Sequence, residues 1–345
     1  KPGIMDAKPR ILLIYTGGTI GSMEDPETGS LRPVNFDELL EFMPELQRLD
    51  VHLQVLPYAN PKDSSDMRPE DWVHLAKLIE ANYPNFDGFV VLHGTDTMAY
   101  TASALSFLLE NLEKPVILTG SQLPMGRLRT DGKENLLSAL EIAAWKEDGA
   151  SLVQEVAVYF EYKLYRGNRC LKYSAMHFNA YQSPNYPLLA EAGVELNFHR
   201  EALWRPGTEP FRCIGSLSTD VASIRFFPGL SVAQVNATLQ QPGLKALIIE
   251  TFGFGNGPYD PEMYSLLEEA GAKGLVMVNI SQCIQGAVQP GRYATGNALA
   301  KIGVLSGHDL TFEAAITKAM YLLGTCSHAD EVKRGFSLSL AGEQS

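Results

Sequence analysis

The sequence has few cysteines, few histidines and no long hydrophobic run, and each shortage excludes a class of protein. The four cysteines, Cys170, Cys213, Cys283 and Cys326, are scattered along the chain and form no C-x-x-C pair. This spacing argues against a disulfide framework and against a zinc site, and it favours separate thiols in a reducing compartment. The seven histidines form no H-x-x-x-H pair, so we expect no metal.

Positive charge is scarce as well. The chain has 28 lysines and arginines against 40 aspartates and glutamates, a formal net charge of −12. That balance argues against a nucleic-acid or acidic-membrane partner. No apolar run approaches the roughly 18 residues of a membrane helix, and no signal peptide is recognisable at the N-terminus. We therefore expect a cytoplasmic protein, either a small-molecule enzyme or a soluble scaffold.

What the sequence does contain is an alternation of short apolar runs and helical patterns. "FVVLHGTDT" leads into "ASALSFLLEN", and "LVMVNISQ" leads into "TGNALAKIG". Such alternation predicts an α/β fold with mostly parallel strands and crossover helices. The pattern loosens over residues 186–212, where we place a linker between an N-terminal α/β domain (8–185) and a C-terminal α/β domain (213–345).

Polar loops follow the apolar runs, and in a parallel sheet they meet at one edge. The first is "TGGT", residues 16–19, where Thr19 is either a nucleophile or a turn residue. It matches no dinucleotide fingerprint, because Thr16 occupies the first glycine position of G-x-G-x-x-G, and no G-K-[ST] follows. We therefore expect no nucleotide cofactor.

Three further loops carry candidate polar groups. In "HGTDT", residues 93–97, Thr95 and Asp96 present a hydroxyl and a carboxylate, although Asp96 or Thr97 would also suit the N-cap of the following helix. In "DSSDM", residues 63–67, Ser64 and Ser65 are candidate carboxylate ligands, and Asp66 is a candidate cap.

The last loop, "YRGNRCLKYS", residues 165–174, contains Lys172. A lone lysine is ordinarily a solvated surface charge. Beside an aspartate and a threonine, however, a partly buried lysine can act as the base for a hydroxyl.

Taken in order, "YTGGTIG", "DSSDM", "HGTDT", "PVILTGSQ", "RTDGKENL", "YRGNR" and "FGFGNGP" resemble the bacterial-type L-asparaginase family, and more closely its cytosolic type I branch. The resemblance extends from about residue 10 to about residue 340. It implies a larger N-terminal and a smaller C-terminal α/β domain, and a homotetramer built as a dimer of dimers. It also implies hydrolysis of L-asparagine to L-aspartate and ammonia through a threonyl acyl-enzyme, without a cofactor.

The resemblance assigns a catalytic role to several residues. Thr19 matches the primary nucleophile, and Thr95, Asp96 and Lys172 match a second catalytic group in which the lysine assists Thr95. Tyr293, in "GRYATGNA", is our candidate for the tyrosine that many secreted members carry on the loop after the first threonine, since no tyrosine lies between Tyr15 and Tyr58 here. Tyr293 is equally open to interpretation as a packing aromatic.

The resemblance also suggests how the substrate is held. Asp96 would bind the α-ammonium group, while Ser64 and Ser65 would take the α-carboxylate. Asn256, in "GFGNG", matches an asparagine that reaches toward the partner's site.

The type I branch includes enzymes that a second asparagine activates, and this sequence departs from them. Leu171 and Glu250 stand where a threonine and an arginine would be expected. Because an acid would repel the carboxylate of an effector, the sequence favours an enzyme without such activation.

Three rival functions stand beside the asparaginase. Two are enzymes: a glutaminase-asparaginase, which would also accept the one-methylene-longer glutamine, and an ammonia-supplying subunit of a transfer-RNA amidotransferase, which usually carries an extra N-terminal domain. The third is a catalytically silent amino-acid sensor on the same scaffold. A sensor would be expected to lose a threonine or the lysine, whereas Thr19, Thr95, Asp96 and Lys172 are all present.

Overall fold

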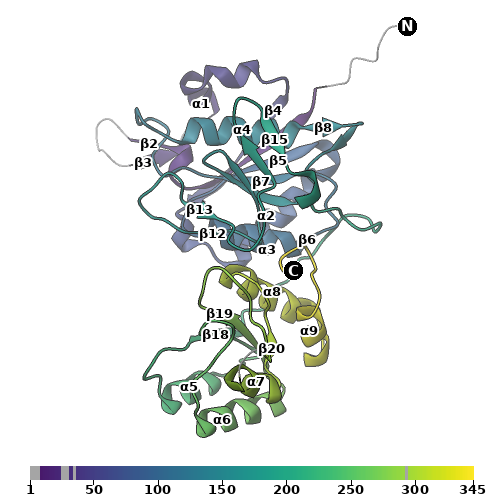
Figure 1. The fold of residues 1–345 in the computed structure, drawn as a ribbon. Helices are drawn as coiled ribbons and strands as arrows, with labels where there is room; N and C mark the ends of the chain where they lie inside the picture. The colour runs from purple at the N-terminus through teal and green to yellow at the C-terminus, as the bar shows by residue number, and fades with distance from the viewer. Residues whose placement is uncertain (1–7, 25–30, 34–35, 292–293) are drawn as a thin grey trace. The chain divides into compact units, whose positions relative to one another are not determined.

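Figure 1 shows the computed structural model of the chain, which describes residues 8–24, 31–33, 36–291 and 294–345. The chain forms two compact units. Unit 1 consists of the described residues up to Ser183 together with Pro187–Ile214, and unit 2 consists of Pro184–Tyr186 and Gly215–Ser345. The expected division into two α/β parts, the larger one first, is what the structure shows.

Unit 1 is built on an eight-stranded sheet in the order β15-β14-β11-β10-β7-β5-β1-β4. The strands from β4 to β10 are parallel, and β11, β14 and β15 continue the sheet in antiparallel fashion. In chain order the strands are β1 (Arg10–Gly17), β4 (His52–Lys62), β5 (Gly88–Leu92), β7 (Val116–Thr119), β10 (Val156–Phe160), β11 (Lys163–Arg166), β14 (Ala190–Ala192) and β15 (Leu196–Phe198).

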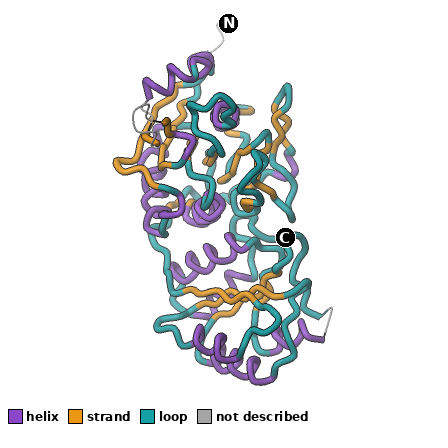
Figure 2. The backbone as a smooth tube through the Cα atoms, turned by 90° about the vertical axis from the view of Figure 1, so that its left-hand side faces the viewer, coloured by secondary structure: helices purple, strands orange, loops and turns teal. Residues whose placement is uncertain are grey.

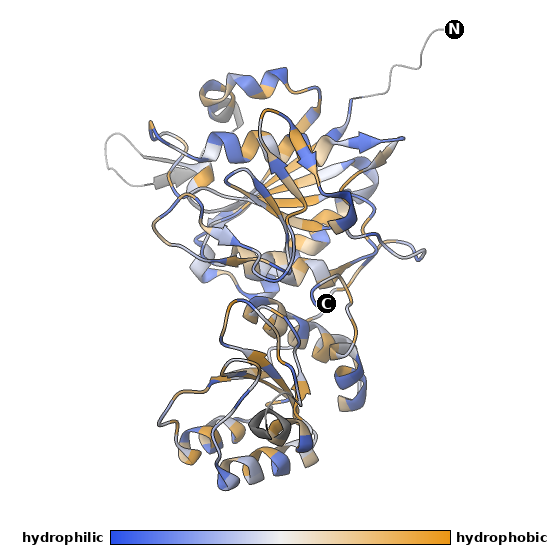
Figure 3. Cartoon of the chain, viewed as in Figure 1, coloured by the Kyte–Doolittle hydropathy of each residue, from blue (hydrophilic) through white to orange (hydrophobic). Residues whose placement is uncertain are grey.

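The central strands of this sheet are mostly apolar, because helices and loops enclose them. In β1 and β5, Ile11, Leu13 and Val91 are completely buried, and Figure 3 shows the hydrophobic colour concentrated on these strands. Helix α4 packs against β1, β5, β7 and β10, and α3 packs against β7 and β10. The helices of unit 1 are α1 (Phe36–Phe42), α2 (Pro69–Asn82), α3 (Met98–Leu108) and α4 (Gly132–Ala144).

The segment that we expected to be a linker, 186–212, lies largely within unit 1. Strands β14 and β15 extend the main sheet, and a buried ion pair anchors the segment that follows them. Arg166 Nε donates to Glu155 at 2.6 Å, Arg166 Nη2 donates to the Ala202 carbonyl, and Glu155 accepts from the Trp204 N–H. A loose local pattern concealed this because long-range partners, not periodicity, hold the segment in place.

Unit 2 has a four-stranded, fully parallel sheet in the order β17-β18-β19-β20. Its helices lie on both faces of the sheet (Figure 2). The strands are β17 (Val221–Arg225), β18 (Ala246–Thr251), β19 (Val276–Ser281) and β20 (Leu305–Ser306); the helices are α5 (Val232–Leu239), α6 (Pro261–Ala272), α7 (Ala294–Lys301), α8 (Phe312–Thr325) and α9 (Ala329–Phe336).

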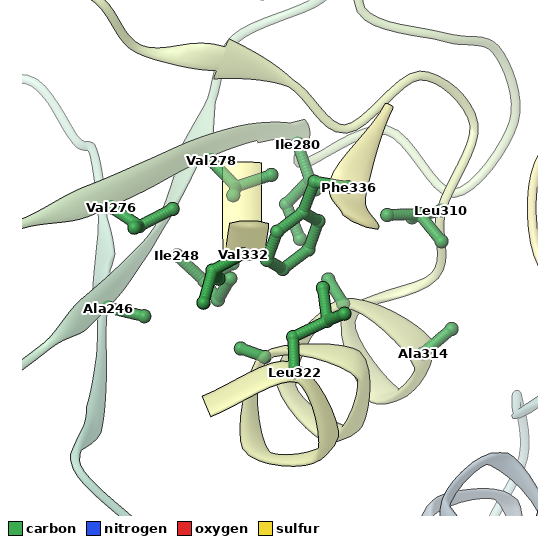
Figure 4. Packing of buried hydrophobic residues seen from close by; sticks show 12 residues of the cluster. Ala246, Ile248, Val276, Val278, Ile280, Leu310, Ala314, Leu322, Val332 and Phe336 are labelled. Atoms are coloured by element: carbon green, nitrogen blue, oxygen red, sulfur yellow. The ribbon is translucent and has the colours of Figure 1, made fainter. Parts of the chain in front are cut away.

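Alternate residues of β18 divide between two hydrophobic cores. Ala246 and Ile248 pack with residues of α8 and α9, such as Leu322 and Phe336 (Figure 4). Leu247 and Ile249 face the opposite way, toward the core formed with α5 and α6. This two-residue period explains why residues 246–249 of the strand are all apolar: both of its faces are covered there.

Short elements complete the chain. They are the ribbons β2–β3 (Ser22–Glu24, Leu31–Pro33), β6–β16 (Leu109–Glu110, Arg212–Cys213), β8–β9 (Lys146–Glu147, Ala150–Ser151) and β12–β13 (Leu171–Lys172, Tyr181–Gln182), and the 3₁₀ turns η1 (Thr19–Gly21), η2 (Pro44–Arg48), η3 (Ser64–Asp66), η4 (Tyr83–Asn85) and η5 (Arg200–Ala202). None of the helices in the described residues combines the length and apolar character needed to cross a membrane.

Candidate active site

Three adjacent parallel strands of unit 1, β4, β1 and β5, end at one edge of the sheet, and the loops that follow them surround a cavity. Its volume is about 320 Å³. Thr19 follows β1, Ser64 follows β4, and Thr95 and Asp96 follow β5. The lining residues are Tyr15, Gly17, Gly18, Thr19, Ser22, Pro61, Lys62, Asp63, Ser64, Gly94, Thr95 and Asp96.

Glycines allow these three loops to touch. Gly18 has φ +84°, a conformation that other residues rarely adopt, and a Cβ there would lie 2.4 Å from the backbone nitrogen of Gly94. A Cβ on Gly94 would in turn lie 2.6 Å from Ser64 Oγ. The abrupt end of the apolar run at "TGG" therefore reflects close backbone packing, which brings Thr19, Ser64 and Thr95 to the same cavity.

Thr19 is the first residue of η1 and is partly exposed at the cavity wall. Its carbonyl accepts a hydrogen bond from the Ser22 hydroxyl at 2.8 Å. Among the described residues, its own hydroxyl forms no hydrogen bond. A hydroxyl that faces a cavity without a protein partner is available to a ligand.

Lys172 reaches the same site from β12. Its Nζ donates to Thr95 Oγ1 at 2.8 Å and to Asp96 Oδ1 at 2.6 Å, and its side chain is only 17% exposed. It is therefore not a solvated surface charge. A lysine amine in contact with a threonine hydroxyl is an arrangement that can activate the hydroxyl.

Two residues that the sequence analysis did not single out hold Thr95 in place. The Thr95 hydroxyl donates to Gln122 Oε1 at 3.2 Å, and the Tyr181 hydroxyl donates to the Thr95 carbonyl. Tyr181 pairs with Lys172 across the β12–β13 ribbon. Gln122 lies just beyond β7, and the residues that follow parallel strands meet at one edge of the sheet, so its position could have indicated Gln122. Nothing in the local sequence points to Tyr181.

The two serines of "DSSDM" are placed differently. Ser64 is buried and lines the cavity, and among the described residues its hydroxyl forms no hydrogen bond. Ser65 is exposed, and both its hydroxyl and its N–H donate to Asp63 Oδ1, at 2.7 and 2.8 Å. These bonds lower the pKa of the Asp63 carboxyl. Asp63 caps η3, whereas α2 has Arg68 at its N-cap, so Asp66 does not cap that helix.

His93 is buried next to Gly94 and has a structural role. Trp72 Nε1 donates to Thr101 Oγ1 at 3.0 Å, so the Thr101 hydroxyl is left to donate to His93 Nε2, which lies 2.9 Å away. His93 Nδ1 then carries the proton and donates to the Gly94 carbonyl at 2.7 Å. Burial lowers the pKa of His93 to about 4, so the ring is neutral at pH 7 and supports the Gly94 backbone.

Tyr15 is the tyrosine of unit 1 that lines the cavity next to Thr19. Its hydroxyl lies 3.5 Å from the Gly18 carbonyl. Burial raises the pKa of Tyr15 to about 12, so its phenol keeps its proton at pH 7 and is a poor base. Tyr293, our candidate for an activating tyrosine, lies outside the described residues.

Asn256 and Glu250 both belong to unit 2. Asn256 forms a bridge with Phe252, to whose carbonyl its N–H donates at 2.8 Å. Glu250, the acid that replaces an expected arginine, accepts from Arg225 Nη1 at 3.1 Å.

Within the described residues, no three histidine, cysteine, aspartate or glutamate side chains gather as a metal site would require. None of the four cysteines takes part in a disulfide.

Comparison with known proteins identifies the family of the chain. A family model described as "Asparaginase, N-terminal" matches residues 10–204, and one described as "Glutaminase/Asparaginase C-terminal domain" matches residues 220–336. The chain belongs to the asparaginase family.

Individual relatives resemble the chain over most of its length. It is 44% identical over 339 residues to L-asparaginase 1 of Escherichia coli strain K12, covering 97% of this chain and 98% of that protein. It is 41% identical to a 60 kDa lysophospholipase of Mus musculus, covering 93% of this chain but 59% of that protein. The crystal structure of L-asparaginase I from Vibrio cholerae superposes with a TM-score of 0.89 at 42% identity, covering 98% and 100% of the two chains. These matches agree with the resemblance to the type I branch.

Proposed function

We propose that the protein hydrolyses the side-chain amide of L-asparagine to L-aspartate and ammonia through an acyl-enzyme on Thr19. The observation that carries this proposal is the contact of Lys172 Nζ with Thr95 Oγ1, at 2.8 Å. Thr95 lines the same cavity as Thr19. A threonine is a weak nucleophile by itself, and an adjacent base is the usual means of activating one.

In the first half of the reaction, Thr19 Oγ1 attacks the side-chain carbonyl carbon of asparagine. The hydroxyl proton passes to the amide nitrogen, the carbon–nitrogen bond breaks, and ammonia leaves an ester on Thr19. We assign to backbone N–H groups near Thr95 the stabilisation of the negative charge that develops on the carbonyl oxygen.

In the second half, water attacks the ester carbon. Lys172 takes the proton of Thr95, and Thr95 takes the proton of the water. The carbon–oxygen bond to Thr19 breaks, its oxygen regains a proton, and aspartate leaves. The pair of Thr95 and Lys172 thus does the work of a general base.

Substrate recognition divides between two loops. Asp96, already paired with Lys172, is the group for the α-ammonium. Ser64 faces the cavity and is the group for the α-carboxylate, and Ser65 supports the same loop through Asp63. We further propose that Asn256 and Tyr293 act at a neighbouring subunit's site in a tetramer built as a dimer of dimers, and that the enzyme is cytoplasmic.

Glutamine is the alternative substrate. It is one methylene longer than asparagine, and a close-fitting pocket penalises one methylene by only about 1–3 kcal/mol. We propose asparagine as the preferred substrate because the chain is similar to proteins named L-asparaginase. Parallel assays with both amides decide the preference.

The test is ammonia release from L-asparagine over a wide concentration range, with Thr19→Ala as the variant. We expect Thr19→Ala to keep its fold by circular dichroism and to lose activity by at least about 10³-fold. We expect the wild-type curve to be hyperbolic, as Leu171 and Glu250 suggest. Wild type that binds asparagine without releasing ammonia would instead support a sensor.

A further inference from the structure

Thr97 begins α3, yet its hydroxyl does not serve that helix. A threonine at an N-cap usually accepts a hydrogen bond from an N–H of the first turn. Thr97 occupies the N-cap position of α3, and its side chain makes no such bond. Its hydroxyl donates instead to the carbonyl of Ser64, at 2.6 Å. A residue that fits the capping pattern has therefore been used for a contact with another loop.

This bond joins the two loops that, in the proposed function, hold the α-carboxylate and the α-ammonium of the substrate. Ser64 faces the cavity from η3, while Asp96 precedes Thr97 directly in the chain. The Ser64 side chain also packs onto Gly94, where an added Cβ would lie 2.6 Å from its Oγ. Ser64 is thus held at its side chain by contact with Gly94 and at its carbonyl by Thr97.

The side-chain hydrogen bonds of Asp63 act within the loop of η3 itself. Asp63 accepts two hydrogen bonds from Ser65, only two residues away. These bonds shape the turn, but they do not fix the distance of η3 from the Thr95–Asp96 loop. The Thr97 bond spans 33 residues of sequence and does fix that distance.

We infer that Thr97 is a positioning residue for substrate binding: its hydroxyl sets the separation between the carboxylate-binding Ser64 and the ammonium-binding Asp96. The inference rests on the proposed function, because it takes the roles of Ser64 and Asp96 from it. Thr97 touches no reacting atom, so its loss acts on the binding of the substrate's charged end and leaves the chemistry at Thr19 in place.

The test compares Thr97→Val, Thr97→Ser and Thr119→Val in steady-state assays with L-asparagine. Valine has nearly the shape of threonine without the hydroxyl, and serine restores the hydroxyl. Thr119→Val is the matched control, because the Thr119 hydroxyl also donates to a distant carbonyl, that of Tyr159 at 2.8 Å. We expect Thr97→Val to raise KM about tenfold with kcat within about twofold, Thr97→Ser to restore KM, and Thr119→Val to lower thermal stability without changing KM.

A pair of competitive inhibitors adds a readout that a structural role would not move. L-Aspartate carries the α-carboxylate, and β-alanine is the same molecule without it. We expect Thr97→Val to weaken inhibition by L-aspartate about tenfold and to leave inhibition by β-alanine within about twofold of wild type.

Three results would overturn the inference: an unchanged KM in Thr97→Val, an equal rise of KM in Thr119→Val, or a loss confined to kcat. An inactive wild type would be a failure of the proposed function instead. In that case calorimetric binding of L-aspartate to wild type and to Thr97→Val makes the same comparison, with the same expected tenfold weakening.

Discussion

The two units use the same architecture at their sheet edges in opposite ways. Each has a sheet with adjacent parallel strands that end in polar loops. In unit 1, Thr19 and Ser64 face a cavity, and among the described residues their hydroxyls form no hydrogen bond. In unit 2, the polar side chains at the corresponding edge bond to one another and to nearby backbone.

Three side chains show this pairing at the edge of the unit 2 sheet. Thr251 Oγ1 donates to Asn279 Oδ1 at 2.6 Å, and Asn279 Nδ2 donates to the Gly255 carbonyl at 3.1 Å. Gln282 Nε2 donates to the carbonyls of Phe226 and Glu250. These polar side chains therefore have hydrogen-bond partners within unit 2 itself. A parallel sheet therefore provides the position of a site, and hydroxyls that face a cavity without a hydrogen bond provide its chemistry.

The largest expected effect comes from removing Lys172, the lysine that contacts Thr95 at the edge of the unit 1 sheet. We expect Lys172→Met to lower kcat by about 10²–10⁴-fold, because the Thr95 hydroxyl loses its base. Ammonia release and circular dichroism measure activity and fold. The control is Lys245→Met, which removes an exposed lysine paired with Asp220 in unit 2 and should leave kcat unchanged. Activity of Lys172→Met within tenfold of wild type would show that Lys172 is not the base.

A second change tests the close packing of Gly94 against Ser64 at the cavity. Gly94→Ala places a methyl 2.6 Å from Ser64 Oγ and should push η3 away from the Thr95 loop. We expect kcat/KM to fall about 100-fold and stability to fall by about 1–3 kcal/mol. Gly193→Ala is the control, since the nearest atom to its Cβ is 3.8 Å away. Equal activity of the two variants would contradict the packing argument.

The smallest expected effect is in unit 2 and concerns stability alone. Burial, together with the charge of Glu250, raises the pKa of Glu313 from the ordinary 4.5 to about 7. The folded state therefore holds this proton more tightly than the unfolded state, and stability declines as the pH rises from about 4.5 through 7.

Glu313→Gln removes this titration. We expect the variant to be more stable than wild type by roughly 1–2 kcal/mol at pH 8 and nearly equal to it at pH 5, with unchanged activity. Urea unfolding at both pH values is the measurement. A stability difference that did not grow between pH 5 and pH 8 would show that Glu313 does not titrate in this range.

Much of the molecule could be read from local patterns. The apolar runs that became β1, β5, β7, β18 and β19 are buried on both faces, so their hydrophobicity was continuous and easy to recognise. The glycines of "TGGT" and "HGTDT" marked the loops where backbones approach closely. Identification of the family rested on the same motifs.

Other features depended on contacts that no local pattern records. Residues 186–212 lack a clear period, yet β14 and β15 belong to the main sheet because partners far away in the chain pair with them. Ser64 and Ser65 are chemically identical neighbours, and only the turn shaped by Asp63 decided that one faces the cavity and the other the solvent.

Residue types and their order along the chain were thus sufficient for the α/β class, for the family and for a short list of candidate residues, because periodicity and motif spacing are local properties. Tertiary structure alone decided that Lys172 meets Thr95 across 77 residues of sequence, that Gln122 and Tyr181 support it, and that Thr97 joins two loops rather than capping its own helix. The physical reason is that a hydrogen bond depends on distance in space, which the folded sheet creates and the order of residues does not record.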